Sequence, residues 1–261
     1  MIVVNFDTVD ILLKSKQRGE ESLIPILIDA IQENQGCIDF VTLACDVLSN
    51  ISLSKRGVSK IVRSFGGPVL HKLMKNTESP AIMQSAMAAL YNVAYGSSSL
   101  IGELVKVDCV SSITAALEAS ARNPELSAAA FGLLGLLAGA NEEAKRKISN
   151  PNMISVVLDT VRNHKMLELE LEAFTLLCSI DHTADKQLSM NTAKSVLQSM
   201  EIFSKEEEIQ FNGCKTLLRV LAAQPESRAL KSLLRTGSGR EILMSVPSIC
   251  KDAAQLLLHN P

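Results

Sequence analysis

The chain of 261 residues has no tryptophan, only 3% aromatic residues in all, and almost no imbalance of charge. Sheets favour aromatic and β-branched side chains, so this composition is typical of closely packed helices with alanine and leucine in the core. The formal net charge is −2, and the 26 Lys and Arg residues are dispersed among 28 Asp and Glu residues. A protein that binds nucleic acid usually carries a distinct basic surface. We therefore expect no nucleic-acid partner.

The chain also lacks a metal-binding motif and a long apolar run. Its six cysteines lie far apart, without a CxxC pair or a histidine at metal-ligand spacing. The longest apolar run, residues 128–140, is too short to cross a bilayer and is interrupted by glycines. We expect reduced, buried thiols, no cofactor, no direct membrane insertion and a cytoplasmic location, with the nucleus possible. Membrane attachment through a partner, or through a segment that precedes this sequence, stays open.

A short apolar phrase returns along the chain at intervals of 40 to 43 residues, each time with the spacing of a helix. The leucines that anchor its copies are Leu48, Leu90, Leu133, Leu176, Leu217 and, in a weaker copy, Leu257. A period of this length predicts stacked helical units, because each unit can bury its apolar face only against its neighbours. We expect one elongated domain, residues 1–261, with repeats near 1–53, 54–95, 96–138, 139–181, 182–223 and 224–261.

Each period contains two shorter helical segments before the anchored helix. In the second repeat, residues 54–65 form a basic helix that we expect to end in a left-handed turn at Gly66-Gly67. Pro68 and Pro80 then open the second and third helices, because proline suits the first turn. In the third repeat, Asn123 and Pro124 form a helix-start signal. The same order of helices predicts separate first and second helices in the fifth repeat, at residues 181–190 and 193–203.

A three-helix unit with a glycine turn and a third helix of the form AxxALxNLA resembles the armadillo repeat. The second repeat carries the resemblance best, through Gly66, Gly67, Leu70, Leu73, Ala86, Ala89, Leu90 and Asn92. The two-helix HEAT repeat is the alternative, and the third helix favours armadillo. The resemblance covers essentially the whole chain. It implies an all-α, right-handed α-solenoid of about six repeats, whose third helices line a concave groove for a partner's peptide or helix.

The resemblance further implies which columns of the third helices face this groove. The predicted partner-binding residues are Asp46, Asn50, Gln84, Asn92, Phe131, Phe174, Glu170, Phe211, Lys215 and Arg219. They form a gradient from polar through apolar to basic, so we expect a partner segment with apolar anchors and an acidic end. Two alternatives stay open: Phe131 and Phe174 are equally suited to core packing, and asparagines are common near helix C-termini. The tryptophans with which nuclear import adaptors of this family hold lysine side chains are absent, which disfavours that role.

Catalytic motifs are weak throughout the chain. His182 lies beside Asp181 without an accompanying nucleophile motif, and residues 237–241 lack the strand and lysine of a phosphate-binding loop. We therefore expect a non-enzymatic scaffold or adaptor for protein-protein interaction. A clasp on a folded domain, of the kind made by chaperone cofactors, and a structural or assembly subunit are the alternatives. The partner's identity and the oligomeric state stay open.

Overall fold

The computed structural model describes residues 23–119, 123–182 and 185–259, and all the regular elements in these ranges are helices. The helices recur in the order that the repeat period predicts, so the fold class is the expected α-solenoid. The chain divides into two compact units, and the boundary in the sequence lies between Asn141 and Glu142, at the end of the third repeat. A single domain spanning both units stays a prediction.

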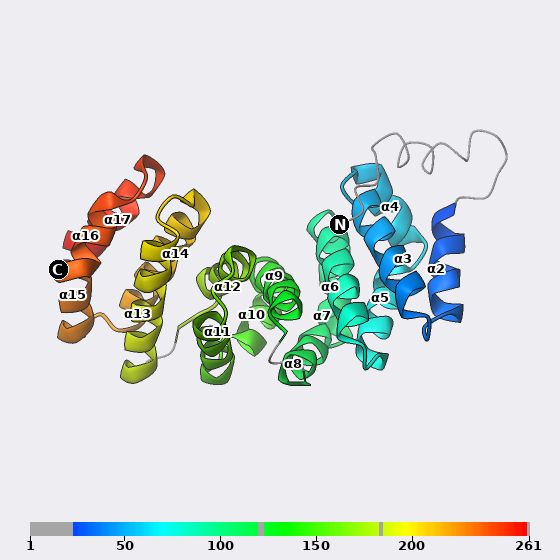
Figure 1. The fold of residues 1–261 in the computed structure, drawn as a ribbon, viewed down its shortest axis with the longest axis horizontal. Coiled ribbons are helices and arrows are strands. Elements are labelled where there is room, and N and C mark those ends of the chain that lie inside the picture. The colour runs from blue at the N-terminus through cyan, green and yellow to red at the C-terminus, as the bar shows by residue number, and fades with distance from the viewer. Residues whose placement is uncertain (1–22, 120–122, 183–184, 260–261) are drawn as a thin grey trace. The chain divides into compact units, whose positions relative to one another are not determined.

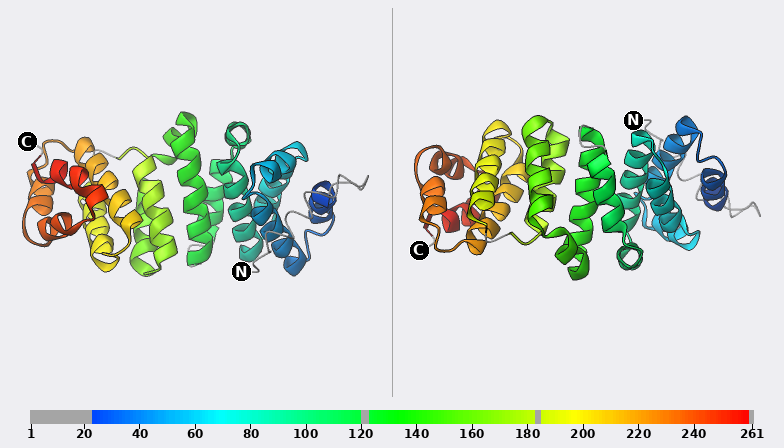
Figure 2. Two further views of the ribbon diagram at one scale, coloured as in Figure 1. Left: turned by 90° about the horizontal axis from the view of Figure 1, so that it is seen from above. Right: turned by 90° about the horizontal axis from the view of Figure 1, so that it is seen from below.

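The first unit holds three repeats. Its helices are α2 (Leu23–Glu33), α3 (Ile38–Ile51), α4 (Lys55–Arg63), α5 (Gly66–Asn76), α6 (Pro80–Tyr95), α7 (Ser98–Lys106), α8 (Cys109–Ala119) and α9 (Pro124–Ala140). The long third helices of the repeats, α3, α6 and α9, pack in sequence with α6 in the middle (Figures 1 and 2). The second and third repeats each have the three expected helices.

The second unit holds the fourth, fifth and sixth repeats. Its helices are α10 (Glu142–Ile148), α11 (Pro151–Asn163), α12 (Leu167–Ser179), α13 (Lys186–Ile202), α14 (Glu207–Ala223), α15 (Arg228–Arg235), α16 (Gly237–Ser245), the short 3₁₀-helix η2 (Ser248–Cys250) and α17 (Lys251–His259). Here α12, α14 and α17 are the third helices, and α14 packs between the other two (Figure 1). Helix α16 ends at Ser245, and Pro247 lies between it and η2.

Polar N-caps explain where seven of these helices begin. The Ser54 hydroxyl accepts a 3.0 Å hydrogen bond from the Gly57 N–H, and the Asn123 side-chain oxygen accepts one of 2.8 Å from the Leu126 N–H. Such a bond satisfies one of the amide groups that a helix leaves free in its first turn. Pro80 and Pro124 occupy the first turns of α6 and α9, as predicted. The helix boundaries thus follow from local sequence chemistry.

The turn before α5 differs from the prediction. The left-handed residue is Phe65, with φ of 58°, and the corresponding turn before α8 places Asp108 at φ of 55°. Gly66 and Gly67 lie inside the first turn of α5 instead. A Cβ on Gly67 would lie 2.3 Å from Cδ1 of Leu100, so this glycine permits close packing of α5 against the next repeat. The two glycines allow close helix packing, and Phe65 adopts the left-handed conformation of the turn.

The fifth repeat also differs from the prediction, because its first two helices are one. Helix α13 runs without a break for 17 residues from Lys186 to Ile202. The segment between the two expected helices contains no glycine or proline that would stop a helix. The fifth repeat therefore has the two-helix form of the HEAT alternative, while its neighbours keep three helices.

The core confirms the repeat anchors. The six anchoring leucines, Leu48 to Leu257, are 0% exposed. All six cysteines are free thiols; Cys37 is exposed and the other five are buried. Burial raises the pKa of Cys45 and Cys109 to about 12, with nearby carboxylates adding to the effect, so these thiols stay protonated. The cysteines inside the helices act as small apolar core residues.

Candidate functional site

The predicted polar residues of α3 and α6 lie on the surface of the first unit, beside exposed apolar side chains such as Leu43. Asp46 and Asn50 on α3, and Gln84 and Asn92 on α6, are all partly exposed, as the sequence predicted. Asn92 Nδ2 donates a 2.6 Å hydrogen bond to Ser49 Oγ, whereas Asn50 Nδ2 donates to the Asp46 carbonyl of its own helix at 2.8 Å. Both amides thus have partners within the fold. Their binding of another chain stays a prediction.

Helix α9 corrects one of the predicted binding residues. Phe131 is 0% exposed and belongs to the core, as the packing alternative stated. The partly exposed positions along this helix include Ala129 and Leu136. The aromatic side chain of Phe131 therefore stabilises α9 and does not face solvent.

Helix α12 requires the same correction. Phe174 is 1% exposed and Glu170 is 0% exposed, so neither presents its side chain to a partner. Burial raises the pKa of the Glu170 carboxyl, and Lys165 Nζ lies 3.9 Å from its Oε1. Leu171, Thr175 and Ser179 are partly exposed, each one position beyond the predicted column, and Glu172 beside them is partly exposed as well.

Adjacent leucines explain this shift. The phrase contains Leu133-Leu134 in α9 and Leu176-Leu177 in α12, and all four leucines are fully buried. Choosing the first leucine instead of the second moves every assigned column by one residue, which is about 100° around a helix. The second leucine of each pair assigns Leu136 and Ser179 to the exposed side.

Helix α14 carries the predicted residues on its exposed side. Phe211 is 38% exposed, Lys215 is exposed and Arg219 is partly exposed. Lys215 Nζ lies 5.0 Å from the centre of the Phe211 ring, a distance at which a cation is attracted to the face of the ring. Lys215 has no ion-pair partner among the described residues. Its charge is therefore available to a ligand.

Arg219 extends from α14 to the end of α12. Its Nη1 lies 3.5 Å from the Ile180 carbonyl oxygen and 3.7 Å from Oδ1 of Asp181, which also accepts an ion pair from Lys145 at 3.0 Å. Exposed pairs of this kind are weak. The Arg219 guanidinium is thus held beside α12 without being fully neutralised there.

Polar side chains join α12 and α14 beneath this surface. Asn212 Nδ2 donates to Thr175 Oγ1 at 3.2 Å, and the Cys178 thiol lies 3.8 Å from Asn212 Oδ1. Thr175 and Asn212 were not predicted from the sequence. With Leu177 as the anchor of α12, the same pattern assigns Thr175 to the exposed side. We name the exposed residues of these two helices, Leu171, Thr175, Ser179, Phe211, Lys215 and Arg219, the α12–α14 face.

The two ends of the α12–α14 face carry charges of opposite sign. Glu168 and Glu172 lie in the N-terminal half of α12, and Glu208 lies in the first turn of α14. Burial raises the pKa of Glu172 to about 7, with Glu208 and then Glu168 adding repulsion. The opposite end carries Lys215 and Arg219. The α12–α14 face therefore runs from an acidic end, past the Phe211 ring, to a basic end.

Two other kinds of site are absent from the residues that the structure describes. Within residues 23–119, 123–182 and 185–259, no group of three or more histidine, cysteine or acidic side chains is placed to hold a metal ion. In the same ranges, no helix combines the length and apolar character that a membrane crossing requires.

Comparison with known proteins agrees with this fold. No family model and no curated protein matches the sequence. An engineered protein of known crystal structure superposes with a TM-score of 0.72 at 18% identity, over 92% of this chain and 96% of that chain. A designed armadillo repeat protein in complex with the peptide (KR)4 superposes with a TM-score of 0.62 at 16% identity, over 90% of this chain and 98% of that chain. At such identities the likeness shows the fold alone, and that fold is an armadillo-like repeat.

Proposed function

We propose that this protein is a non-enzymatic interaction scaffold that binds an extended or helical segment of another protein on the α12–α14 face. The observation that carries this proposal is the exposed Phe211 ring with the Lys215 ammonium, which has no ion-pair partner among the described residues, 5.0 Å from its centre. An aromatic ring next to a cation offers both apolar contact and charge recognition. Such residues are typical of the centres of protein interfaces.

The order of groups along the face defines the segment that fits it. An apolar side chain would lie against Phe211 and Leu171, and an acidic side chain would follow at the end that carries Lys215 and Arg219. A basic side chain would suit the opposite end, beside Glu168 and Glu172. The designed armadillo neighbour holds a peptide of lysine and arginine. The Lys215 end of this chain would repel such a peptide, so we propose a partner of different charge.

The partly exposed polar residues of α3 and α6 form a second surface for the same kind of partner. Asp46 and Gln84 offer oxygen atoms to a peptide backbone, whereas Asn92 would first have to release Ser49. We propose that this face contributes less to binding than the α12–α14 face. An adaptor role in the cytoplasm is consistent with this assignment and is part of the proposal.

Affinity capture from a cell extract tests the proposal. The bait proteins are the wild type, a Phe211→Ala/Lys215→Glu double variant and a Lys194→Glu control, which reverses one exposed charge on α13. We expect partners that wild type and the control retain and the double variant loses. A synthetic peptide from the retained partner should then bind the wild type directly. Identical sets of captured proteins for all three baits would refute the assignment to this face. Retention of a partner only as a folded domain would favour the clasp alternative.

A further inference from the structure

The first repeat carries an apolar groove between α2 and α3. Its volume is about 390 Å³, and all its lining residues are apolar, among them Leu27 on α2 and Val47 on α3. Ile26, which also lines it, is 47% exposed. We name this hollow the α2–α3 groove. The end repeats of a solenoid usually turn a polar face to solvent, so an apolar groove here indicates a surface that another element covers.

The internal repeat of the chain indicates what kind of surface fits this groove. Leu70 and Ala89 lie one repeat period after Leu27 and Val47, and both are 0% exposed, whereas Leu27 and Val47 are partly exposed. Helices α5 and α6, which carry Leu70 and Ala89, pack against α2 and α3 of the preceding repeat. The α2–α3 groove is therefore on the side by which one repeat stacks on the repeat before it.

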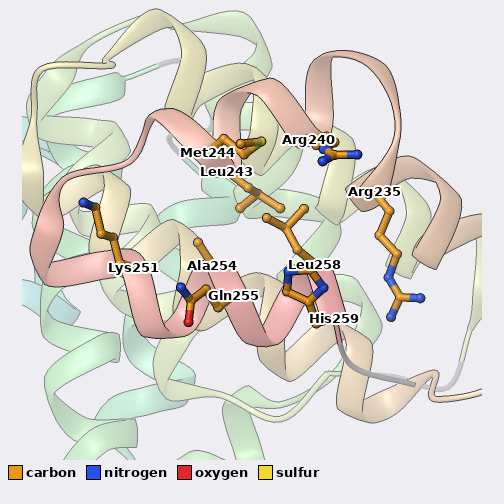
Figure 3. A pocket seen from close by; sticks show the side chains of 9 residues that line it. All are labelled: Arg235, Arg240, Leu243, Met244, Lys251, Ala254, Gln255, Leu258 and His259. Atoms are coloured by element: carbon orange, nitrogen blue, oxygen red, sulfur yellow. The ribbon is translucent and has the colours of Figure 1, made fainter.

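The last repeat carries a second hollow, of about 560 Å³, which we name the α15–α17 groove (Figure 3). All its lining residues come from α15, α16 and α17. Helix α14 packs against α17 but contributes no residue to the lining, so the groove opens on another side of this repeat. Figure 3 shows Leu243 and Leu258 directed toward each other as its apolar floor. Met244 also lines the groove and is 65% exposed.

The two end repeats carry charges of opposite sign. From Leu23 to Ser54 there is no lysine, arginine or histidine, and the acidic residues there are Asp29, Glu33, Asp39 and Asp46. The last repeat is basic, and no acidic side chain lines its groove. Figure 3 shows the charged ends of Arg235, Arg240 and Lys251 pointing apart around the apolar floor. Separate charges around an apolar centre are typical of a protein interface.

We propose that the last repeat of a second copy of this chain covers the α2–α3 groove, so that copies associate head to tail. Met244 of one copy enters the α2–α3 groove of the next, and Ile26 packs against Leu243 and Leu258. A methionine side chain is flexible enough to fill an irregular hollow. The acidic first repeat then faces the basic last repeat, which favours this pairing over a contact between two first repeats. The proposal does not depend on partner binding at the α12–α14 face.

The proposal implies a specific pattern of association. Two different surfaces meet in a head-to-tail contact, so each added copy leaves one surface of each kind free. Sedimentation equilibrium of the full chain, at concentrations up to about 500 μM, measures the average mass. The proteins are the wild type, Ile26→Asp, Met244→Asp and the control Val107→Asp, which places the same charge on an exposed apolar residue of the third repeat.

The mass of the wild type and of the control should rise with concentration. Each of the two end variants alone should associate at least about tenfold more weakly, because an aspartate would be buried in the contact. An equimolar mixture of the two end variants should form dimers and no larger species, since only one competent pair of surfaces remains. Because Ile26 and Met244 are exposed, both variants should keep the helical circular dichroism of the wild type.

Three results would overturn the proposal. Loss of association in Ile26→Asp but not in Met244→Asp would show that two α2–α3 grooves pair with each other. A mixture of the end variants that stays monomeric would exclude the head-to-tail contact. A monomeric wild type at about 500 μM would show that a segment outside the described residues, or another protein, covers the α2–α3 groove instead.

Discussion

The side-chain amide of Asn92 donates a 2.6 Å hydrogen bond to the hydroxyl of Ser49 and thereby joins the third helices of two consecutive repeats. Asn212 and Thr175 make a comparable join of 3.2 Å between α14 and α12. A buried or half-buried polar pair fixes the relative position of two helices more specifically than apolar packing does. In this chain, the side-chain amide of Asn92, one of the predicted groove residues, is already engaged within the fold.

Replacement of Asn92 by alanine should lower the free energy of unfolding by about 1 kcal/mol, because a neutral hydrogen bond contributes about that much. Ser49→Ala should have a similar effect. Urea unfolding of the two single variants and the double variant measures the coupling between the residues. We expect the double variant to lose less stability than the sum of the single losses. Strict additivity would contradict a direct contribution of this hydrogen bond.

The two aromatic residues Phe174 and Phe211 should respond oppositely to truncation. Phe174→Ala empties a fully buried position and should cost about 3–5 kcal/mol of stability. Phe211→Ala removes a ring that is 38% exposed and should cost about 1 kcal/mol, while abolishing partner binding at the α12–α14 face. Chemical denaturation and peptide binding separate the two effects. Equal losses of stability would show that Phe211 is also a core residue.

Two glycines offer a matched pair for the packing of the first unit. A Cβ on Gly57 would lie 1.9 Å from the Ile51 carbonyl oxygen, so Gly57→Ala should destabilise by about 1–3 kcal/mol. Gly102 lies in α7 with no atom within 4 Å of such a Cβ. Gly102→Ala should therefore stabilise by about 0.5–1 kcal/mol, since alanine favours helix. Thermal unfolding of both variants is the measurement. A destabilised Gly102→Ala protein would contradict this prediction.

Glu172 should make the free energy of unfolding depend on pH between its ordinary pKa of 4.5 and its folded-state pKa of about 7. Its folded-state pKa of about 7 lies above its unfolded value, so the folded state binds the proton more tightly. The free energy of unfolding should fall as pH rises from about 4.5 to about 7. In this window the Glu172 carboxyl is still protonated in the folded state but has lost its proton in the unfolded state, so each rise in pH favours unfolding. Glu172→Gln should remove this part of the pH dependence and become relatively more stable toward pH 7. Urea unfolding at several pH values tests the slope, with Glu168→Gln as a variant that should weaken it. An unchanged slope in Glu172→Gln would refute the assignment.

The sequence predicted the helical repeat well because its anchoring leucines must be buried in every copy. It predicted the exposed side of α14 correctly, through Phe211, Lys215 and Arg219. The exposed sides of α9 and α12 could not be assigned from the same pattern, since two adjacent leucines are both compatible with a buried column. Only the packed positions of Leu134 and Leu177 show which residues point outward. The cavity beside Arg235 was not predicted, because it depends on three helices meeting and not on a motif.

The unbroken helix α13 has a consequence for how this chain would accept new segments. In the second and third repeats, the turns at Phe65 and Asp108 interrupt the backbone hydrogen bonds between two helices. A foreign loop entering there would interrupt few bonds that hold a helix together. In α13 the corresponding point lies in the middle of a 17-residue helix, about 25 Å long, where an inserted loop would divide one helical ladder into two short pieces. The middle of α13 is therefore less open to domain insertion or circular permutation than the turns at Phe65 and Asp108, which are the natural entry points in their repeats.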